Sequence, residues 1–161
     1  MFAGFLNDQR HVNGVDITYR IGGSGPGLLL LHGHPQTHVI WHKVAEQLAE
    51  HFTVIAADLR GYGDSSKPPA DDQHASYSKR EMARDGVELE HDQADIEAGH
   101  QLNLPLLVLW GAEGTVGRCF EPLREWQQVA TDVRGKALPA GHYIAEEVPE
   151  LLLAEVLGFL R

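Results

Sequence analysis

The sequence predicts an α/β fold, with a mostly parallel sheet flanked by helices. Three continuous apolar runs, LLLL (28–31), TVIAAD (53–58) and LPLLVLW (104–110), lack in–out alternation, which is typical of strands buried on both faces. Segments with apolar residues at helical spacing lie between and after these runs. Strands that alternate with helices form parallel sheets with right-handed crossovers, so this order predicts the α/β class.

The N-terminal half supplies two of these strands and one helix. Residues 15–21 alternate between apolar and polar side chains, which predicts a half-exposed strand ahead of the turn GGSGPG at 22–27. Apolar residues recur at helical spacing from residue 39 to about 50, so we expect a helix between the strands at 28–31 and 53–58. The stretch RGYGDSSKPP, rich in glycine and proline, then predicts a loop.

The C-terminal half continues the alternation. Residues 77 to about 98 are polar and permit a helix, but they lack a clean apolar stripe. After the strand at 104–110, we expect an amphipathic helix over 120–129 and a short strand over 136–139. A last helix is expected over 149–160, with proline at its start.

Length and composition bound the organisation of the chain. Its 161 residues, 43% of them hydrophobic, are enough for a core, so we expect a single domain over 1–161. The formal net charge of -10 argues against nucleic acid or an anionic membrane as a partner. The one cysteine, the start MFAGFLNDQR and the lack of long apolar runs predict no disulfide, no signal peptide and no membrane span. We therefore expect a cytoplasmic protein.

Two histidine motifs follow strand ends, where ligands meet an open α/β sheet. The strand at 28–31 stops at HGHP (32–35), and the strand at 136–139 is followed by Gly141-His142. A histidine motif after an early strand, together with a histidine after the last strand, is the frame of an α/β-hydrolase.

Four longer stretches narrow this resemblance. HGHPQTHVIWHKVA, AADLRGYGDSSKP, LWGAEGTVGRCFEPLREW and ALPAGHYIAEEVPE are similar to segments of the haloacetate (fluoroacetate) dehalogenases of the α/β-hydrolase superfamily. The resemblance covers two blocks, residues 1–85 and 88–161. The HGxP and DxRGxGxS patterns are shared with epoxide hydrolases and haloalkane dehalogenases, whereas the two runs nearer to the C-terminus are more specific.

The resemblance implies hydrolysis of a small haloacid or ester, without a cofactor. In this family an aspartate attacks the carbon that bears the halogen, and a histidine activates the water that cleaves the resulting ester. His142 matches that general base, a role for which imidazole is suited near neutral pH. The backbone at His34 matches the loop that lines the substrate pocket with its amide groups.

One part of the family pattern is missing from this sequence. The elbow that bears the nucleophile, Gly-His-Asp-Arg-Gly, has no counterpart, and neither has the helical cap that receives halide. Residues 77–85 pass directly into GVELEHD (86–92), which indicates an internal deletion near 85–88, on the order of 100 residues. We therefore expect a truncated α/β-hydrolase fold without a cap domain, inactive because the nucleophile is absent.

Other interpretations of the function stay open. The chain could be a non-catalytic interaction scaffold, or a weak esterase or epoxide-hydrolase-like enzyme. It could also bind metal, because His32, His34, His38 and His42 lie close in sequence and the last two share a helix face. The simpler interpretation of these histidines is an inherited hydrolase loop, so we expect no metal.

Substitutes for the nucleophile are few. Ser65 and Ser66 lie outside any G-x-S-x-G pattern and are expected to be turn residues. Cys119 is expected to be an ordinary residue, and Glu113 an exposed loop carboxylate, although many α/β-hydrolases place the acid for their histidine near there. Asp58 is expected to fix its own turn by accepting backbone N–H bonds.

The missing strands also bear on assembly. The strands at 28–31 and 106–110 should either pair directly or be left as apolar edges. Direct pairing is favoured, because unpaired backbone in buried strands costs about 1–3 kcal/mol per group. Loss of the cap would uncover an apolar mouth around His34 and Trp110, so we expect a homo-oligomer.

Overall fold

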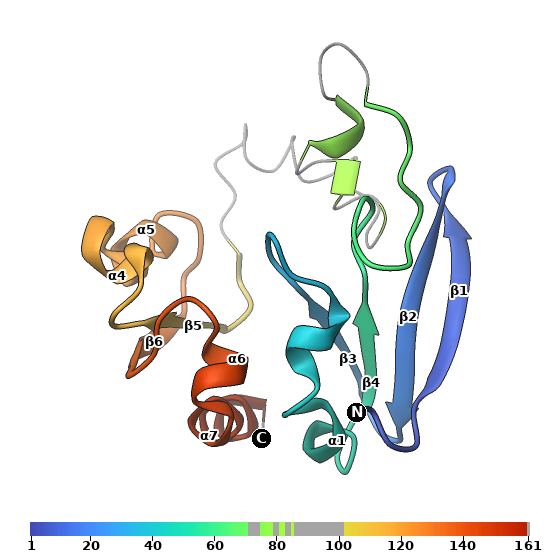
Figure 1. Ribbon diagram of the computed structural model, residues 1–161. Helices are drawn as coiled ribbons and strands as arrows, with labels where there is room; N and C mark the ends of the chain where they lie inside the picture. The colour runs from blue at the N-terminus through green and yellow to red at the C-terminus, as the bar shows by residue number, and fades with distance from the viewer. Residues whose placement is uncertain (71–74, 79–80, 83–84, 86–101, 161) are drawn as a thin grey trace. The chain divides into compact units, whose positions relative to one another are not determined.

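The computed structural model describes residues 1–70, 75–78, 81–82, 85 and 102–160 (Figure 1). The chain divides into two compact units, Met1–Leu89 and Glu90–Arg161, which we call unit 1 and unit 2. Most of the segment predicted to permit a helix, 77 to about 98, lies outside the described residues. Among the residues that the structure describes, no helix is long and apolar enough to cross a membrane.

Unit 1 contains a four-stranded sheet in the order β1-β2-β4-β3. Its strands are β1 (Leu6–Val12), β2 (Val15–Gly23), β3 (Gly27–Leu31) and β4 (Thr53–Ala57). β3 and β4 are parallel, as predicted, whereas β2 is antiparallel to both β1 and β4. The carboxyl ends of β3 and β4 therefore meet at the same edge of the sheet, where the HGHP and DLRGYGDS loops begin.

Strand β1 was not predicted, because six of its seven residues are exposed and give no apolar pattern. The signal for it lies in the turn that follows. Asn13 and Gly14 adopt φ angles of 45° and 73°, the left-handed pair of a tight type I′ hairpin turn. An Asn-Gly pair between two strands is the strongest short-range sequence signal for a hairpin, and it extends the sheet by one strand here.

Two short helices replace the continuous helix predicted from residue 39. They are the 3-10 helix η1 (His38–Trp41) and α1 (Ala45–Leu48), and a further 3-10 turn, η2, spans Ala75–Tyr77. η1 contacts β3 and β4, and α1 contacts β2 and β4. These contacts build a core cluster of Phe2, Ala45 and Ala56 on one side of the sheet.

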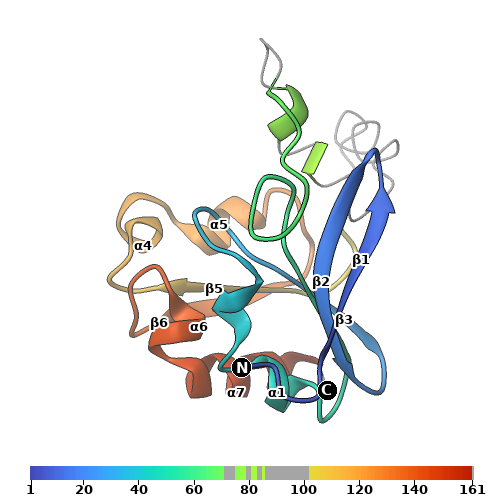
Figure 2. The same cartoon turned by 45° about the vertical axis from the view of Figure 1, so that its right-hand side comes forward.

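Unit 2 is built on two parallel strands, β5 (Leu106–Gly111) and β6 (Val133–Leu138). The helix expected over 120–129 is present as the shorter α5 (Pro122–Trp126), and α4 (Thr115–Cys119), which was not predicted, precedes it. The chain ends in α6 (Ile144–Glu147) and α7 (Pro149–Leu160), and α7 has the predicted bounds (Figure 2). An ion pair of 2.7 Å between Lys136 Nζ and Glu155 Oε1 joins β6 to α7.

The predicted direct pairing of 28–31 with 106–110 would join the two units, and the structure describes β3 and β5 in separate sheets, one in each unit. Each has its own parallel neighbour instead, β4 for β3 and β6 for β5. β3 stands at the end of its sheet, and its burial alternates rather than being complete on both faces. Leu29 and Leu31 are 46% and 48% exposed, so the alternative of an apolar edge describes β3 better.

Candidate functional site

Asp58 organises the loops at the carboxyl edge of the unit 1 sheet. Its carboxylate is completely buried, and its Oδ1 accepts the backbone N–H of His38 at 2.7 Å. The same oxygen lies 2.9 Å from His38 Nδ1, and Oδ2 accepts the N–H of Asp64 at 3.0 Å. Burial by itself raises the pKa of Asp58, but the hydrogen bonds from His38 and Asp64 outweigh it and hold the pKa below its usual value. Asp58 is therefore an ionised structural acceptor, which confirms the turn-fixing role predicted for it.

Gly63 makes this arrangement possible. It adopts a φ angle of 47°, and a Cβ atom on it would lie 1.9 Å from Asp58 Oδ2. Any larger side chain would therefore push the carboxylate out of the turn and would strain the backbone as well. This explains one glycine of the DLRGYGDS loop by direct contact.

Ser65 and Ser66 bind the same loop to strand β2. The Ser65 hydroxyl donates to Asp58 O at 2.7 Å and accepts the N–H of Thr18 at 2.8 Å. The Ser66 hydroxyl accepts the N–H of Asp16 at 2.9 Å. Both serines have the structural role that was predicted, since their hydroxyl groups are engaged with the backbone.

His32 joins the loop after β3 to the loop after β4. Its Nε2 accepts the N–H of Leu59 at 3.0 Å, and its Nδ1 lies 2.8 Å from Gly33 O. Because Nε2 must carry a lone pair and Nδ1 must donate, His32 is held as the neutral Nδ1–H tautomer. This buried ring is therefore part of the floor of the site.

His34, the residue predicted at the pocket lip, is exposed at the same edge. Its Nδ1 lies 2.9 Å from the hydroxyl of Tyr62, so the HGHP loop and the DLRGYGDS loop meet through these two side chains. Tyr62 was not singled out from the sequence. The two rings are 6.0 Å apart and nearly perpendicular, which places two polar groups at the opening between the loops.

The four neighbouring histidines do not converge on a metal. His32, His34 and His38 contact Leu59, Tyr62 and Asp58 as described above, and His42 Nδ1 lies 3.0 Å from Val39 O. Within the described part of the chain, no group of three or more His, Cys, Asp or Glu side chains is arranged to hold a metal ion. The histidine-rich metal site therefore gains no support from this region.

Arg60 is also committed to a structural contact. It forms a buried bidentate ion pair with Asp85, in which Nε donates to Oδ2 at 2.7 Å and Nη2 to Oδ1. The hydrogen bond to Asp85 raises the pKa of Arg60. Asn13 Nδ2 donates to the same carboxylate at 3.1 Å. This arginine therefore holds the end of the described part of unit 1 against the loop after β4, and it is not free to clamp a substrate carboxylate.

His142 lies in unit 2, in the turn between β6 and α6. Its side chain is exposed, and its ring packs edge-on against Tyr143 with 5.2 Å between ring centroids. Glu147, a residue that the sequence analysis missed, accepts the N–H of Gly141 at 2.7 Å and that of Tyr143 at 2.9 Å. These two hydrogen bonds lower the pKa of Glu147, so the carboxylate beside His142 is ionised. No sequence signal distinguishes Glu147, because the capping-box spacing of three residues from Tyr143, the N-cap of α6, points to Glu146 instead.

The end of β5 supports the His142 turn from another side. A Cβ atom on Gly111 would lie 1.7 Å from Gly141 O, so only glycine allows this close approach of the two backbones. The N–H of Glu113 donates to Ala140 O at 3.0 Å. The Glu113 side chain is exposed, as expected, and Cys119, the last residue of α4, is exposed as well.

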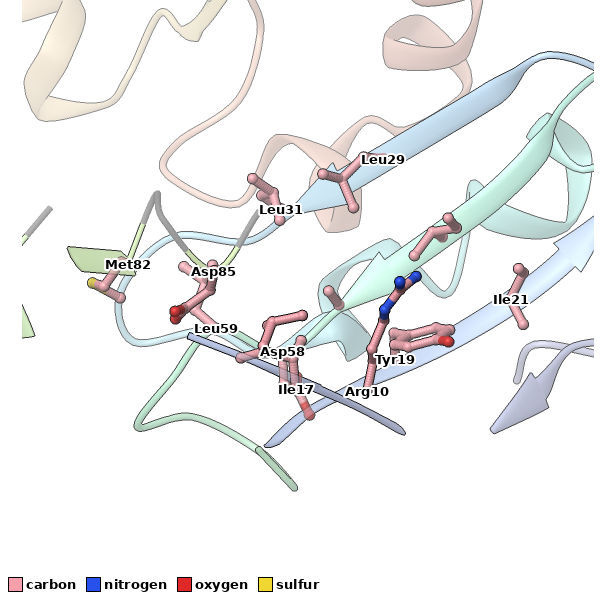
Figure 3. Close-up of a pocket in the computed structure, with 13 residues that line it drawn as sticks. Arg10, Ile17, Tyr19, Ile21, Leu29, Leu31, Asp58, Leu59, Met82 and Asp85 are labelled. Carbon is pink, nitrogen blue, oxygen red and sulfur yellow. The ribbon is translucent and has the colours of Figure 1, made fainter. Parts of the chain in front are cut away.

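A separate hollow of about 460 Å³ lies against the unit 1 sheet (Figure 3). Aliphatic side chains from three strands line it, including Ile17, Leu29 and Ile55, with Arg10 and Tyr19 beside them. Neither His34 nor His142 is among the described residues that line this hollow. Asp58, Leu59 and Asp85 also line it, so the hollow runs along the apolar face of the sheet as far as the carboxyl edge, without reaching either predicted histidine.

Comparison with known proteins agrees with this geometry. The family model of the alpha/beta hydrolase fold matches residues 26–102. A solved structure from Nostoc sp PCC 7120, described as an alpha/beta hydrolase, is similar with a TM-score of 0.90 and 26% identity, covering 99% of this chain and 99% of that chain. The chain has an α/β-hydrolase fold.

Two curated enzymes are similar to part of this chain. Fluoroacetate dehalogenase of Burkholderia sp is 54% identical over 89 residues, which are 55% of this chain and 29% of that enzyme. Soluble epoxide hydrolase of Corynebacterium sp. (strain C12) is 49% identical over 89 residues, again 55% of this chain and 29% of that enzyme. The matched segments thus span less than a third of either relative.

Proposed function

We propose that this chain carries the general base, His142, and the pocket lip, at His34, of a hydrolase of the haloacetate-dehalogenase type. We further propose that it lacks the nucleophile and does not dehalogenate. The likeness to fluoroacetate dehalogenase supports the class of reaction. The observation that carries the proposal is the environment of Asp58. This carboxylate at the carboxyl edge of the sheet is buried and already hydrogen-bonded to His38 and Asp64, so it is not available as a nucleophile.

Dehalogenation needs a carboxylate that is free to attack, and the two buried carboxylates described in unit 1 are both held by other groups. A carboxylate oxygen must form a bond to carbon while the carbon–halogen bond breaks and halide leaves. Asp85 is held by Arg60, and Asp58 by His38 and Asp64, so neither of these buried carboxylates can attack. The remaining chemistry is general base catalysis at His142, in which the imidazole takes a proton from water as the water attacks an activated ester. A single positioned base contributes about 10²–10⁴-fold, far below a typical enzymatic acceleration of about 10⁶ or more.

Halide release and ester hydrolysis, measured on the purified 161-residue chain, test this proposal. We expect no halide from fluoroacetate or chloroacetate above background, and slow hydrolysis of 4-nitrophenyl acetate. His142→Ala should abolish the ester hydrolysis, whereas His51→Ala, which removes another exposed imidazole, should leave it unchanged. Halide turnover by the chain would overturn the proposal. An ester rate that does not depend on His142 would favour a non-catalytic scaffold.

The likeness to soluble epoxide hydrolase supports a second candidate, an epoxide-hydrolase-like enzyme. Ring opening of an epoxide by this family's route would again need a carboxylate nucleophile. Diol formation from styrene oxide, measured in the same experiment, would therefore favour this candidate and contradict the absence of a nucleophile.

The organisation of the chain remains part of the proposal. We propose that units 1 and 2 form one domain and that the chain makes a homo-oligomer. The exposed Leu29 and Leu31 on the edge strand β3 support self-association, because contiguous apolar surface at a sheet edge favours a partner. Light scattering on the assay samples reports the oligomeric state. The cytoplasmic location stays a prediction.

A further inference from the structure

We propose that Glu147 is the positioning residue for His142, by holding the backbone on both sides of it. This inference rests on the proposed role of His142 as the general base. Glu147 Oε2 accepts the N–H of Gly141, the residue before His142, at 2.7 Å. Its Oε1 accepts the N–H of Tyr143, the residue after His142, at 2.9 Å. One carboxylate thus spans the peptide units that set the direction of the His142 side chain.

Helix capping accounts for only one of these two bonds. Tyr143 is the N-cap of α6, and a glutamate in the first turn commonly bonds back to the N–H of the N-cap residue. Gly141 lies two residues before that cap, so its N–H is not one of the free donors of the helix. The bond to Gly141 therefore stabilises the turn before the helix, in which His142 is the next residue.

Apart from Glu147, little in the surroundings of His142 fixes the orientation of its side chain. His142 is exposed, so no core packing fixes its side chain, and its printed ring contact is with the equally exposed Tyr143. On the other side of the turn, the backbone of Gly111 approaches Gly141 O too closely for any Cβ atom. Gly141 is thus fixed at its carbonyl by close packing and at its N–H by Glu147. The ionised carboxylate also attracts the imidazolium that forms when His142 takes a proton.

Nuclear magnetic resonance of the full chain tests the inference without reference to turnover. The variants are Glu147→Ala, which removes both acceptors, and Glu147→Gln, which keeps one acceptor oxygen. Glu150→Gln is the matched control, because it removes the same charge from an exposed residue of α7. In Glu147→Ala we expect both the Gly141 and the Tyr143 amide signals to move upfield. In the same variant, the χ1 couplings of His142 should change from those of one rotamer to averaged values. Glu147→Gln should give an intermediate change, and Glu150→Gln should give no change.

Ester hydrolysis gives the size of the effect. We expect kcat of Glu147→Ala to fall about 10-fold while KM changes little, because a misplaced base weakens the chemical step rather than binding. A role in capping alone would move the Tyr143 signal but leave the Gly141 signal, the His142 couplings and kcat unchanged, and that result would overturn the inference. If His142→Ala leaves ester hydrolysis intact, the proposed function fails, and the His142 couplings still decide whether Glu147 positions this side chain.

Discussion

Asp58 in unit 1 and Glu147 in unit 2 use the same chemistry in opposite environments. Asp58 directly follows β4 and Glu147 ends α6, and each carboxylate accepts two backbone N–H groups. Each has a pKa held below the usual value, with hydrogen bonds as the lowering cause. Asp58 is completely buried and also contacts the imidazole of His38, whereas Glu147 is exposed.

This difference in burial gives the two carboxylates different roles. Asp58 stabilises the loops of unit 1, whereas Glu147 is proposed to position the general base His142. Burial commits Asp58 to its donors, since any loss of a partner would leave polar groups without water. Exposure lets Glu147 exchange its donors for water at little cost in stability. Replacement of Glu147 should therefore affect the proposed base catalysis by His142 more than the stability of unit 2. A carboxylate that binds the backbone is evidence for function only when its burial and its partners are known.

The largest effect that separates the two carboxylates is expected from removing the charge of Asp58. In Asp58→Asn the amide nitrogen must replace one oxygen, so a donor faces either the N–H of Asp64 or the donors of His38. We expect the free energy of unfolding of unit 1 to fall by about 3 kcal/mol, because two buried N–H donors would face each other and the charge that strengthens the hydrogen bonds would be lost. Urea unfolding followed by circular dichroism, with amide exchange in β2 and β4, measures it. Glu147→Gln is the matched variant and should leave the unfolding midpoint nearly unchanged; equal losses would remove the distinction.

A smaller effect is expected from the glycine beside each carboxylate. In Gly63→Ala the new Cβ would lie 1.9 Å from Asp58 Oδ2, and the φ angle of 47° strains any residue with a Cβ. We expect a loss of about 2 kcal/mol in the free energy of unfolding. In Gly141→Ala the new Cβ would lie 3.2 Å from Glu147 Oε1, so this exposed carboxylate would have to shift by only a few tenths of an ångström. Thermal melts of both variants should show a clear decrease in Tm for the first and little change for the second.

The sequence predicted the parts of the fold that show up as apolar patterns. The buried strand β4 and the final helix α7 were placed to within a residue or two, because a continuous apolar run and a helical period are local signals. β1 was missed because it is exposed, and η1 ends at Trp41 although the helical period continues, since tertiary contacts rather than periodicity set where that helix stops.

The residues of the candidate site also fall into those that the sequence predicted and those that it did not. The role of Asp58 was predicted, because a carboxylate that opens a glycine-rich loop commonly binds the backbone of its own turn. The pair of Arg60 with Asp85 joins residues 25 positions apart, and no local pattern encodes it. Glu147 was hidden among neighbouring glutamates, and only the backbone donors that it meets distinguish it. Side-chain roles that depend on a specific partner are thus beyond periodicity and motif.

The smallest effect is expected from pH, and it sharpens the comparison at Asp58. Its pKa is lowered in the folded state, whereas the unfolded chain has the ordinary aspartate value of about 3.9. Asp58 therefore contributes its full stabilisation above about pH 4, and loses it as the pH falls through the lower folded value, where both states are protonated. Asp58→Asn has no such group, so the stability gap between wild type and this variant should narrow as the pH falls from 7 to 3. Urea midpoints of the two proteins across this range measure the gap, and a gap that stays constant would mean that the ionised form of Asp58 is not what holds the turn.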